Sequence, residues 1–138
     1  MNVAGTPGGV SGFAGDGGPA TAAQLNAAGQ LAFGGGALYI GGGNRIRKVS
    51  HSLLLPSGDG DIDGDLDEII TTVAGTGDFD FSGDGGPAIA AKLKGPLGIA
   101  LDAAGNLYFA DGNNNRIRKV DAATGITSPR PLGGWPSG

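Results

Sequence analysis

Residues 83–125 decide the fold of this 138-residue chain and read GDGGPAIAAKLKGPLGIALDAAGNLYFADGNNNRIRKVDAATG. Short runs at 98–102 and 107–111 are mostly apolar, the run at 116–120 combines basic residues with Ile and Val, and turn residues rich in Gly, Asn and Asp separate them. Gly, Asn and Asp supply the backbone conformations that tight turns need, and runs of this length at hairpin spacing are typical of antiparallel strands. The stretch therefore predicts a meander of short strands.

The same pattern occurs earlier in the chain, so the sequence contains an internal repeat. Four pairs of segments match in the same order: residues 3–6 and 73–76, 13–20 and 81–88, 38–39 and 107–108, and 44–49 and 115–120. The β-branched run 69–74 adds a fourth strand to the first copy. We predict an all-β fold with two four-stranded antiparallel units, each shaped like a propeller blade.

Alanine-rich segments connect the units. Pro87 fits the first position of a helix, where a missing N–H has no cost, and Gly95-Pro96 would end that helix. We predict one or two helical turns from Pro87 to Lys94, and likewise from Pro19 to Gln24 or Leu25.

Composition restricts the classes of function. The chain has no cysteine, which excludes disulfides and thiolate metal sites, and its net charge of −4 disfavours binding to nucleic acid. The 30 glycines lack a Gly-X-Y period, and with 39% hydrophobic residues they fit many turns between short strands. No apolar stretch could span a membrane, and no signal-peptide pattern is visible, so the location stays open between the cytoplasm and, as part of a longer protein, an extracytoplasmic site.

The stretch 83–125, with the TTVAGTG segment before it, resembles an NHL repeat of the long bacterial type. The first copy departs from that pattern at Ala27-Ala28, at Gly34-Gly35-Gly36 and at Gly41-Gly42-Gly43. The resemblance implies a single propeller segment over residues 1–138. Its expected parts are a first repeat at 3–75, an acidic hairpin insertion at 50–68 and a second repeat at 76–138.

The resemblance implies a non-catalytic scaffold that binds a protein or a small ligand. Two alternatives remain open, a partial or inactive piece of a propeller lyase or lactonase, and a calcium-stabilised extracellular adhesion module. The single histidine, His51, cannot form a His-based zinc site, and no GxSxG or HExxH motif is present. We therefore predict no catalytic residues.

The sequence predicts an extra outer strand at the start of the chain and an interrupted one at its end. Asn2-Val3-Ala4-Gly5 resembles an outer strand with no blade before it, whereas Pro129 and Pro131 interrupt the last outer strand. One hypothesis is that the N-terminal strand completes a blade of a neighbouring molecule, so that three chains form a six-bladed ring. The alternative is that the sequence is a fragment of a longer propeller.

The acidic run at 59–68, between the third and fourth strands expected in the first copy, fits a calcium loop. The aspartates of a D-x-D-x-D-G-x-x-D pattern are Asp59, Asp61, Asp63 and Asp67, and Asp65 within it is a fifth candidate ligand. Calcium takes six to eight oxygen ligands, and alternate carboxylates on a tight loop converge on one point. Calcium is therefore the one cofactor that the sequence suggests. Ile70 stands where an EF-hand has Glu, so the loop is not an EF-hand, and a solvated hairpin tip is the alternative.

Two Arg-Ile-Arg-Lys strands contain six of the nine basic residues. Strand alternation places Arg45 with Arg47, and Arg116 with Arg118, on one face. We expect these side chains to pair with carboxylates of an adjacent blade rather than to bind RNA. Asp16, Asp84 and Asp111 are expected to be turn formers that accept backbone N–H groups.

Overall fold

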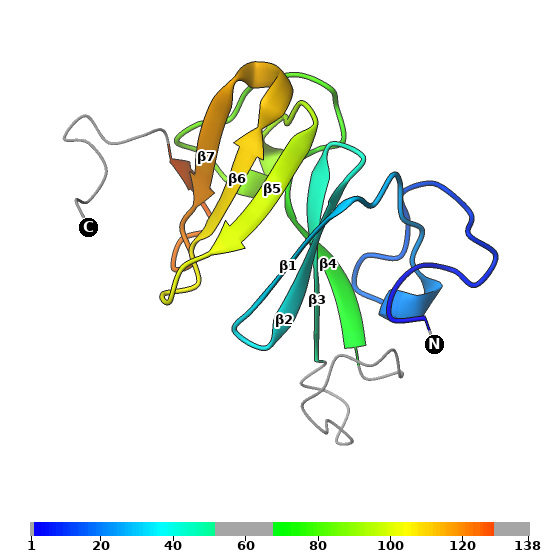
Figure 1. Cartoon of the computed structure of the whole chain (residues 1–138). Helices are drawn as coiled ribbons and strands as arrows, with labels where there is room; N and C mark the ends of the chain where they lie inside the picture. The colour runs from blue at the N-terminus through cyan, green and yellow to red at the C-terminus, as the bar shows by residue number, and fades with distance from the viewer. Residues whose placement is uncertain (1, 52–67, 129–138) are drawn as a thin grey trace.

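The computed structural model describes residues 2–51 and 68–128, which form two antiparallel sheets of four strands each (Figure 1). The first sheet consists of β1 (Gln30–Gly34), β2 (Ala37–Gly42), β3 (Arg45–His51) and β4 (Glu68–Ala74). The second consists of β5 (Pro96–Leu101), β6 (Leu107–Asp111), β7 (Arg116–Val120) and β8 (Thr127–Ser128). In both sheets the strands follow chain order, so each repeat is a simple meander.

The tight turns depend on residues that tolerate positive φ. Asn44 and Asn115 have φ of 57° and 55° and occupy the same place, immediately before β3 and β7. Gly35 and Gly36, with φ of 60° and 73°, connect β1 to β2. Asn and Gly are the residues that adopt this region at least cost, which is why the turn positions could be read from the sequence.

The helical connections are shorter than predicted. The described residues contain no α-helix, and each connection has a single 3-10 turn, η1 (Ala20–Ala22) and η2 (Ala88–Ala90). Pro19 and Pro87 precede these turns in an extended conformation. A third 3-10 turn, η3 (Gly112–Asn114), lies between β6 and β7.

The GDGG loops extend the sheets at their outer edge. In the first repeat the Gly17 N–H donates to the Ile70 carbonyl of β4, at 2.8 Å, and the Ile70 N–H donates back to Gly18, at 3.1 Å. In the second repeat the Thr127 N–H of β8 donates to Gly86, at 2.9 Å. Each loop is thereby fixed to the outer strand of its own repeat.

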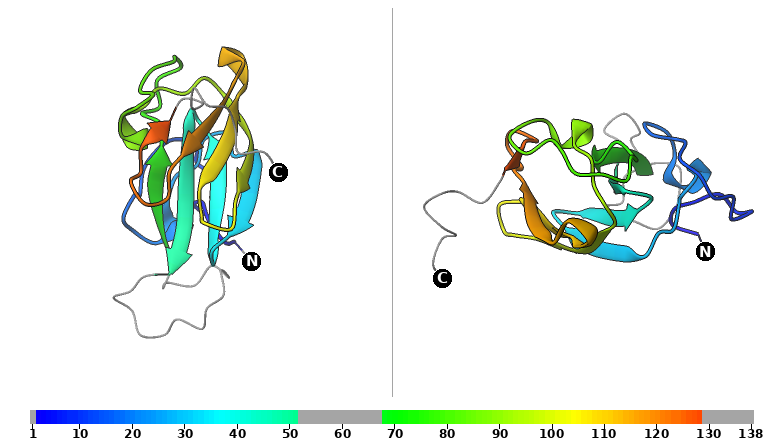
Figure 2. Two further views of the ribbon diagram at one scale, coloured as in Figure 1. Left: turned by 90° about the vertical axis from the view of Figure 1, so that its left-hand side faces the viewer. Right: turned by 90° about the horizontal axis from the view of Figure 1, so that it is seen from above.

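The two sheets lie side by side, and the loops before β1 lie on the side of the first sheet away from the second (Figure 2). Between the sheets lies a core cluster to which both contribute: Ile46, Ala74, Ala88, Ala91, Leu93, Leu107, Phe109 and Val120. A second cluster joins Ile40, Val49 and Ile70 of the first sheet to Ala20 and Ala23 of the connection before it. The described residues form no closed ring, and none of their helices is long and apolar enough to cross a membrane.

Candidate binding surfaces

Each sheet has two faces that the repeat makes equivalent. The face that its own GDGG loop covers is the loop face, and the other, which contains a tyrosine of the second strand, is the tyrosine face. The strand registers show which residues occupy equivalent positions in the two sheets. On the loop faces, the equivalent residues of the first and second sheets are Leu31 and Ile99, Phe33 and Leu101, Ile40 and Phe109, and Arg47 and Arg118. On the tyrosine faces they are Tyr39 with Tyr108, Gly41 with Ala110, Ile46 with Ile117, and Lys48 with Lys119.

A buried arginine fixes the loop to the first sheet. Arg47, with 5% of its side chain exposed, donates from Nε and Nη2 to one Asp16 oxygen, at 3.0 and 2.7 Å. Its remaining donors reach the Gln24 and Ala14 carbonyls, at 2.6 and 3.1 Å. A guanidinium is well suited to this position because its planar donors can reach several acceptors at once.

Arg118 does the same in the second sheet and has a further carboxylate. It donates to Asp84, at 3.2 Å from Nε, to the Ser82 and Lys92 carbonyls, at 2.7 and 2.8 Å, and to Asp111, at 3.3 Å. The Asp111 side chain is fully buried, and Arg118 is 2% exposed. This is the most deeply buried ion pair among the described residues.

These contacts revise two expectations from the sequence. The arginines do pair with carboxylates, but Asp16 and Asp84 come from the loop of the same repeat rather than from an adjacent unit. Both loop aspartates are ion-pair partners of these arginines, and the backbone N–H that Asp16 accepts is that of Thr72 on the outer strand rather than one in its own turn. Asp111 accepts the Lys94 N–H, at 2.7 Å, from the segment before β5 rather than from its own hairpin turn, and it also binds Arg118.

The environment of Asp16 favours its charged form. Burial alone would raise its pKa, but the Thr72 hydroxyl and N–H, at 2.6 and 3.0 Å, and the charge of Arg47 outweigh burial and lower the pKa below its usual value. An ionised Asp16 is therefore part of the folded structure at neutral pH.

The other two arginines of these strands stack on loop phenylalanines. Arg45 Cζ lies 3.5 Å from the ring centroid of Phe13, and Arg116 Cζ lies 3.9 Å from that of Phe81. Four of the basic side chains thus contact their own loops, which supports a structural role for the basic strands. Within the described ranges, no group of three His, Cys, Asp or Glu residues could hold a metal ion.

A cleft of about 710 Å³ opens between the sheets at one end of the interface. Tyr39, Lys48 and Thr72 line it from the first sheet, and Asp102 and Asp121 line it from turns of the second. The carboxylate of Asp102 accepts the N–H and side-chain amide of Asn106, both at 2.9 Å, so its lone pairs are used in its own turn. Burial raises the pKa of Tyr39, which stays neutral. The cleft is large enough to hold a small molecule.

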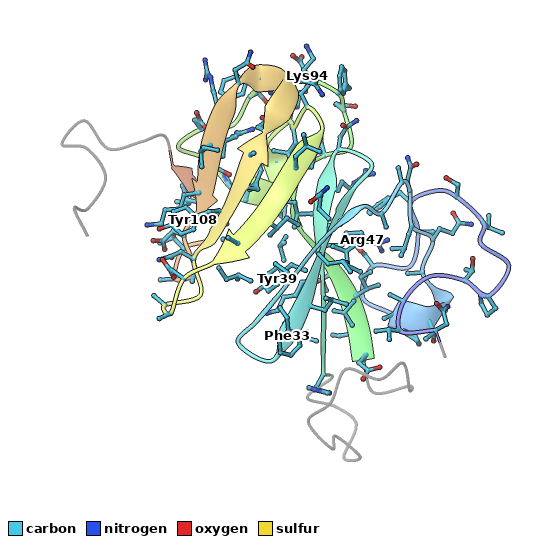
Figure 3. All side chains as sticks on the ribbon, viewed as in Figure 1. Phe33, Tyr39, Arg47, Lys94 and Tyr108 are labelled. Atoms are coloured by element: carbon cyan, nitrogen blue, oxygen red, sulfur yellow. The ribbon has the colours of Figure 1, made fainter. Side chains whose placement is uncertain are left out.

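The most conspicuous surfaces are the two faces that the internal contact leaves open. Ile46 is fully buried between the sheets, whereas its counterpart Ile117 is 58% exposed. Leu31 and Phe33 are each 66% exposed, although their counterparts Ile99 and Leu101 pack against the core cluster. Figure 3 shows Tyr39 between the sheets and Tyr108 on the far side of the second sheet.

The calcium ligands predicted from the sequence, Asp59, Asp61, Asp63, Asp65 and Asp67, lie outside the described residues. That site remains a prediction.

Comparison with known proteins agrees with the geometry. The model of the teneurin NHL domain matches residues 63–129. The repeats are of the NHL type. Chicken teneurin-1 is 43% identical over 83 residues, covering 49% of this chain and 3% of the relative. Human teneurin-4 is 34% identical over 114 residues, covering 70% of this chain and 4% of the relative.

The assignment to the bacterial type is wrong. The NHL repeats match teneurins of chicken, human, mouse and zebrafish, and these relatives point away from a bacterial protein. The bacterial label came from the spacing and the turn residues. These features identify the type of repeat and do not identify the organism. The chain spans 3–4% of the length of these relatives.

Proposed function

We propose that the two NHL sheets are adjacent blades of a β-propeller that binds protein through its open faces and performs no catalysis. One observation carries this proposal. The apolar positions that are buried or half-buried at the contact between the two sheets recur, exposed, on the outer side of each sheet. Exposed apolar patches of this kind are typical of protein–protein contact sites.

The remaining observations fit a scaffold better than an enzyme. The buried arginines of the loop faces are occupied in fixing the loops, and Asp121, which lines the cleft, accepts hydrogen bonds within its own turn. The described residues offer nothing specific to the lyase or lactonase alternative. The fold by itself does not define a function, so the proposal rests on the surfaces.

Site-specific photo-crosslinking tests this function. A photoreactive phenylalanine analogue is placed at Phe33 on the open loop face, or at Ile117 on the open tyrosine face, of the full chain in its source cells. Both positions are expected to give protein adducts. Ile89, which is 60% exposed but lies on η2 beside the cleft, is the matched control and is expected to give none. Equal labelling at all three positions, or none, refutes the proposal.

Calcium binding by the acidic segment is a second proposal, and the D-x-D-x-D-G-x-x-D spacing supports it. Calorimetric titration of the chain with calcium is expected to give saturable heat that the double variant Asp61→Ala/Asp63→Ala lacks. Absence of heat in the unmodified chain ends the idea, as does equal heat in both proteins.

A further inference from the structure

We infer that a second copy of this chain docks its open loop face onto the open tyrosine face of the first, repeating between molecules the contact that joins the two sheets within one molecule. This inference rests on the proposed protein-binding function and names the partner. The contact is heterologous, because two different faces meet.

The internal contact supplies the geometry. Ile46 on the tyrosine face of the first sheet is buried in one cluster with Leu107 and Phe109 of the second. A methyl group at Gly41 would lie 3.0 Å from Ile99, so the glycine lets the second sheet approach closely. A tyrosine face therefore packs against a loop face through one buried isoleucine and a small residue on the neighbouring strand.

The open tyrosine face repeats these elements. Ile117 replaces Ile46, and Ala110, also a small residue, replaces Gly41. The aromatic and basic pair is preserved as well, because Lys119 Nζ lies 5.9 Å from the Tyr108 ring, the same distance as Lys48 Nζ from the Tyr39 ring. The second sheet thus presents the surface that the first sheet uses to hold it.

The open loop face offers the complementary surface. Leu31 and Phe33 take the places of Ile99 and Leu101, which reach across the internal contact. Apolar side chains on both partners make the contact favourable, since it removes their surface from water.

The N-terminal segment adds a second correspondence. The Gly5 N–H donates to Ala20 of η1 at 2.9 Å, and the Gly75 N–H, after β4, donates to Ala88 of η2 at 3.0 Å. Residues 3–5 therefore lie against η1 as the end of β4 lies against η2. Residues 3–5 thus occupy, beside η1, the position that the end of an outer strand occupies beside η2.

The receiving edge is open in the described part of the second sheet. β4 continues along β3 as far as Ile46, which pairs with Ala74. Within residues 2–51 and 68–128, β8 pairs only with Lys119 and Val120, so the edge of β7 at Ile117 is not covered by β8. By the same register, Ala4 of the docking copy lies beside Ile117 of the first.

Sedimentation analysis of the full chain, with one variant for each face, tests the inference. The unmodified chain is expected to sediment as an oligomer. Phe33→Asp and Ile117→Asp each break one face, and each is expected to be monomeric. Ile89→Asp is the control and stays oligomeric. Circular dichroism confirms that each variant is folded.

Mixing the two monomeric variants decides between the modes of docking. Phe33→Asp retains an intact tyrosine face and Ile117→Asp an intact loop face, so an equimolar mixture is expected to form a dimer. Failure of the mixture to dimerise overturns the inference, as does a single variant that still self-associates, which would show that like faces meet. So does an unmodified chain that stays monomeric at all concentrations. If that monomer still cross-links other proteins from positions 33 and 117, the protein-binding function survives and only the self-docking fails.

Discussion

The two repeats fix their loops with the same arginine but surround it differently. Arg118 contacts two carboxylates, Asp84 and the fully buried Asp111, whereas Arg47 contacts one, Asp16. Gly42 occupies the place of Asp111 in the first sheet. The comparison shows that a buried arginine can hold the GDGG loop against the sheet with either one or two carboxylates beside it.

The first repeat compensates for the missing carboxylate through its outer strand. Thr72 gives Asp16 two hydrogen bonds, from its N–H and its hydroxyl. The second repeat has Pro129 at the corresponding place in the sequence, and proline has no N–H to donate. Thr72 and Asp111 are thus alternative ways to stabilise the loop.

The largest difference between the repeats is expected when the arginine is removed. Arg118→Met leaves Asp111 buried without its cation, and loss of one partner of a buried pair costs about 3–5 kcal/mol. Arg47→Met is expected to cost less, because Asp16 is one-third exposed and keeps the Thr72 hydrogen bonds. Urea unfolding at fixed protein concentration measures both. Arg116→Met, at a 54% exposed position, is the control, and equal losses for Arg47→Met and Arg118→Met contradict the comparison.

Gly42 tests why the first repeat lacks the second carboxylate. A Cβ at Gly42 would lie 2.5 Å from the Asn26 carbonyl and 2.7 Å from that of Ala27, both backbone atoms. Gly42→Ala is therefore expected to destabilise the chain by about 1–3 kcal/mol, as overpacking does. Gly29→Ala, whose nearest atom lies at 3.8 Å, is the control and should change the unfolding free energy little. A neutral Gly42→Ala would show that the backbone around Asn26 yields and that sterics do not explain the missing Asp.

Acid should weaken the first loop through Asp16. Its pKa is lower in the folded chain than the ordinary value of 3.8, so ionised Asp16 stabilises the fold above pH 3.8. That contribution is lost as the pH falls from 3.8 through the folded pKa. Thr72→Val removes the hydroxyl donor and is expected to lower the melting temperature at neutral pH. Because Asp102 and Asp121 titrate in the same range in both proteins, the informative quantity is the difference between variant and parent. That difference should shrink in acid, and a pH-independent difference would mean that Thr72 acts by packing alone.

The strands and turns could be predicted from the sequence because local chemistry determines them. Asn44 and Asn115, for example, sit where a positive φ is required. The helical connections were overestimated, because alanine content favours a helix whereas pairing of the GDGG loop with the outer strand leaves room for one 3-10 turn. The partner of each arginine was not predictable, because Asp16 and Arg47 are 31 residues apart and meet only when the loop folds onto the sheet. The two open faces were missed for the same reason, since Ile46 and Ile117 occupy equal sequence contexts and differ only in what packs on them.

The smallest expected effect is a gain in stability at Ala27. This alanine has φ of 48°, in the left-handed region, and its counterpart Gly95 has φ of 70°. A non-glycine residue there costs roughly 1–2 kcal/mol, while the greater freedom of glycine in the unfolded chain costs about 0.4–1 kcal/mol. Ala27→Gly is therefore expected to raise the free energy of unfolding by up to about 1 kcal/mol, whereas Ala28→Gly, which has no positive φ, lowers it. Urea denaturation of both variants distinguishes the outcomes. A lower free energy of unfolding for Ala27→Gly would mean that the loop of the first repeat accommodates the alanine without backbone strain.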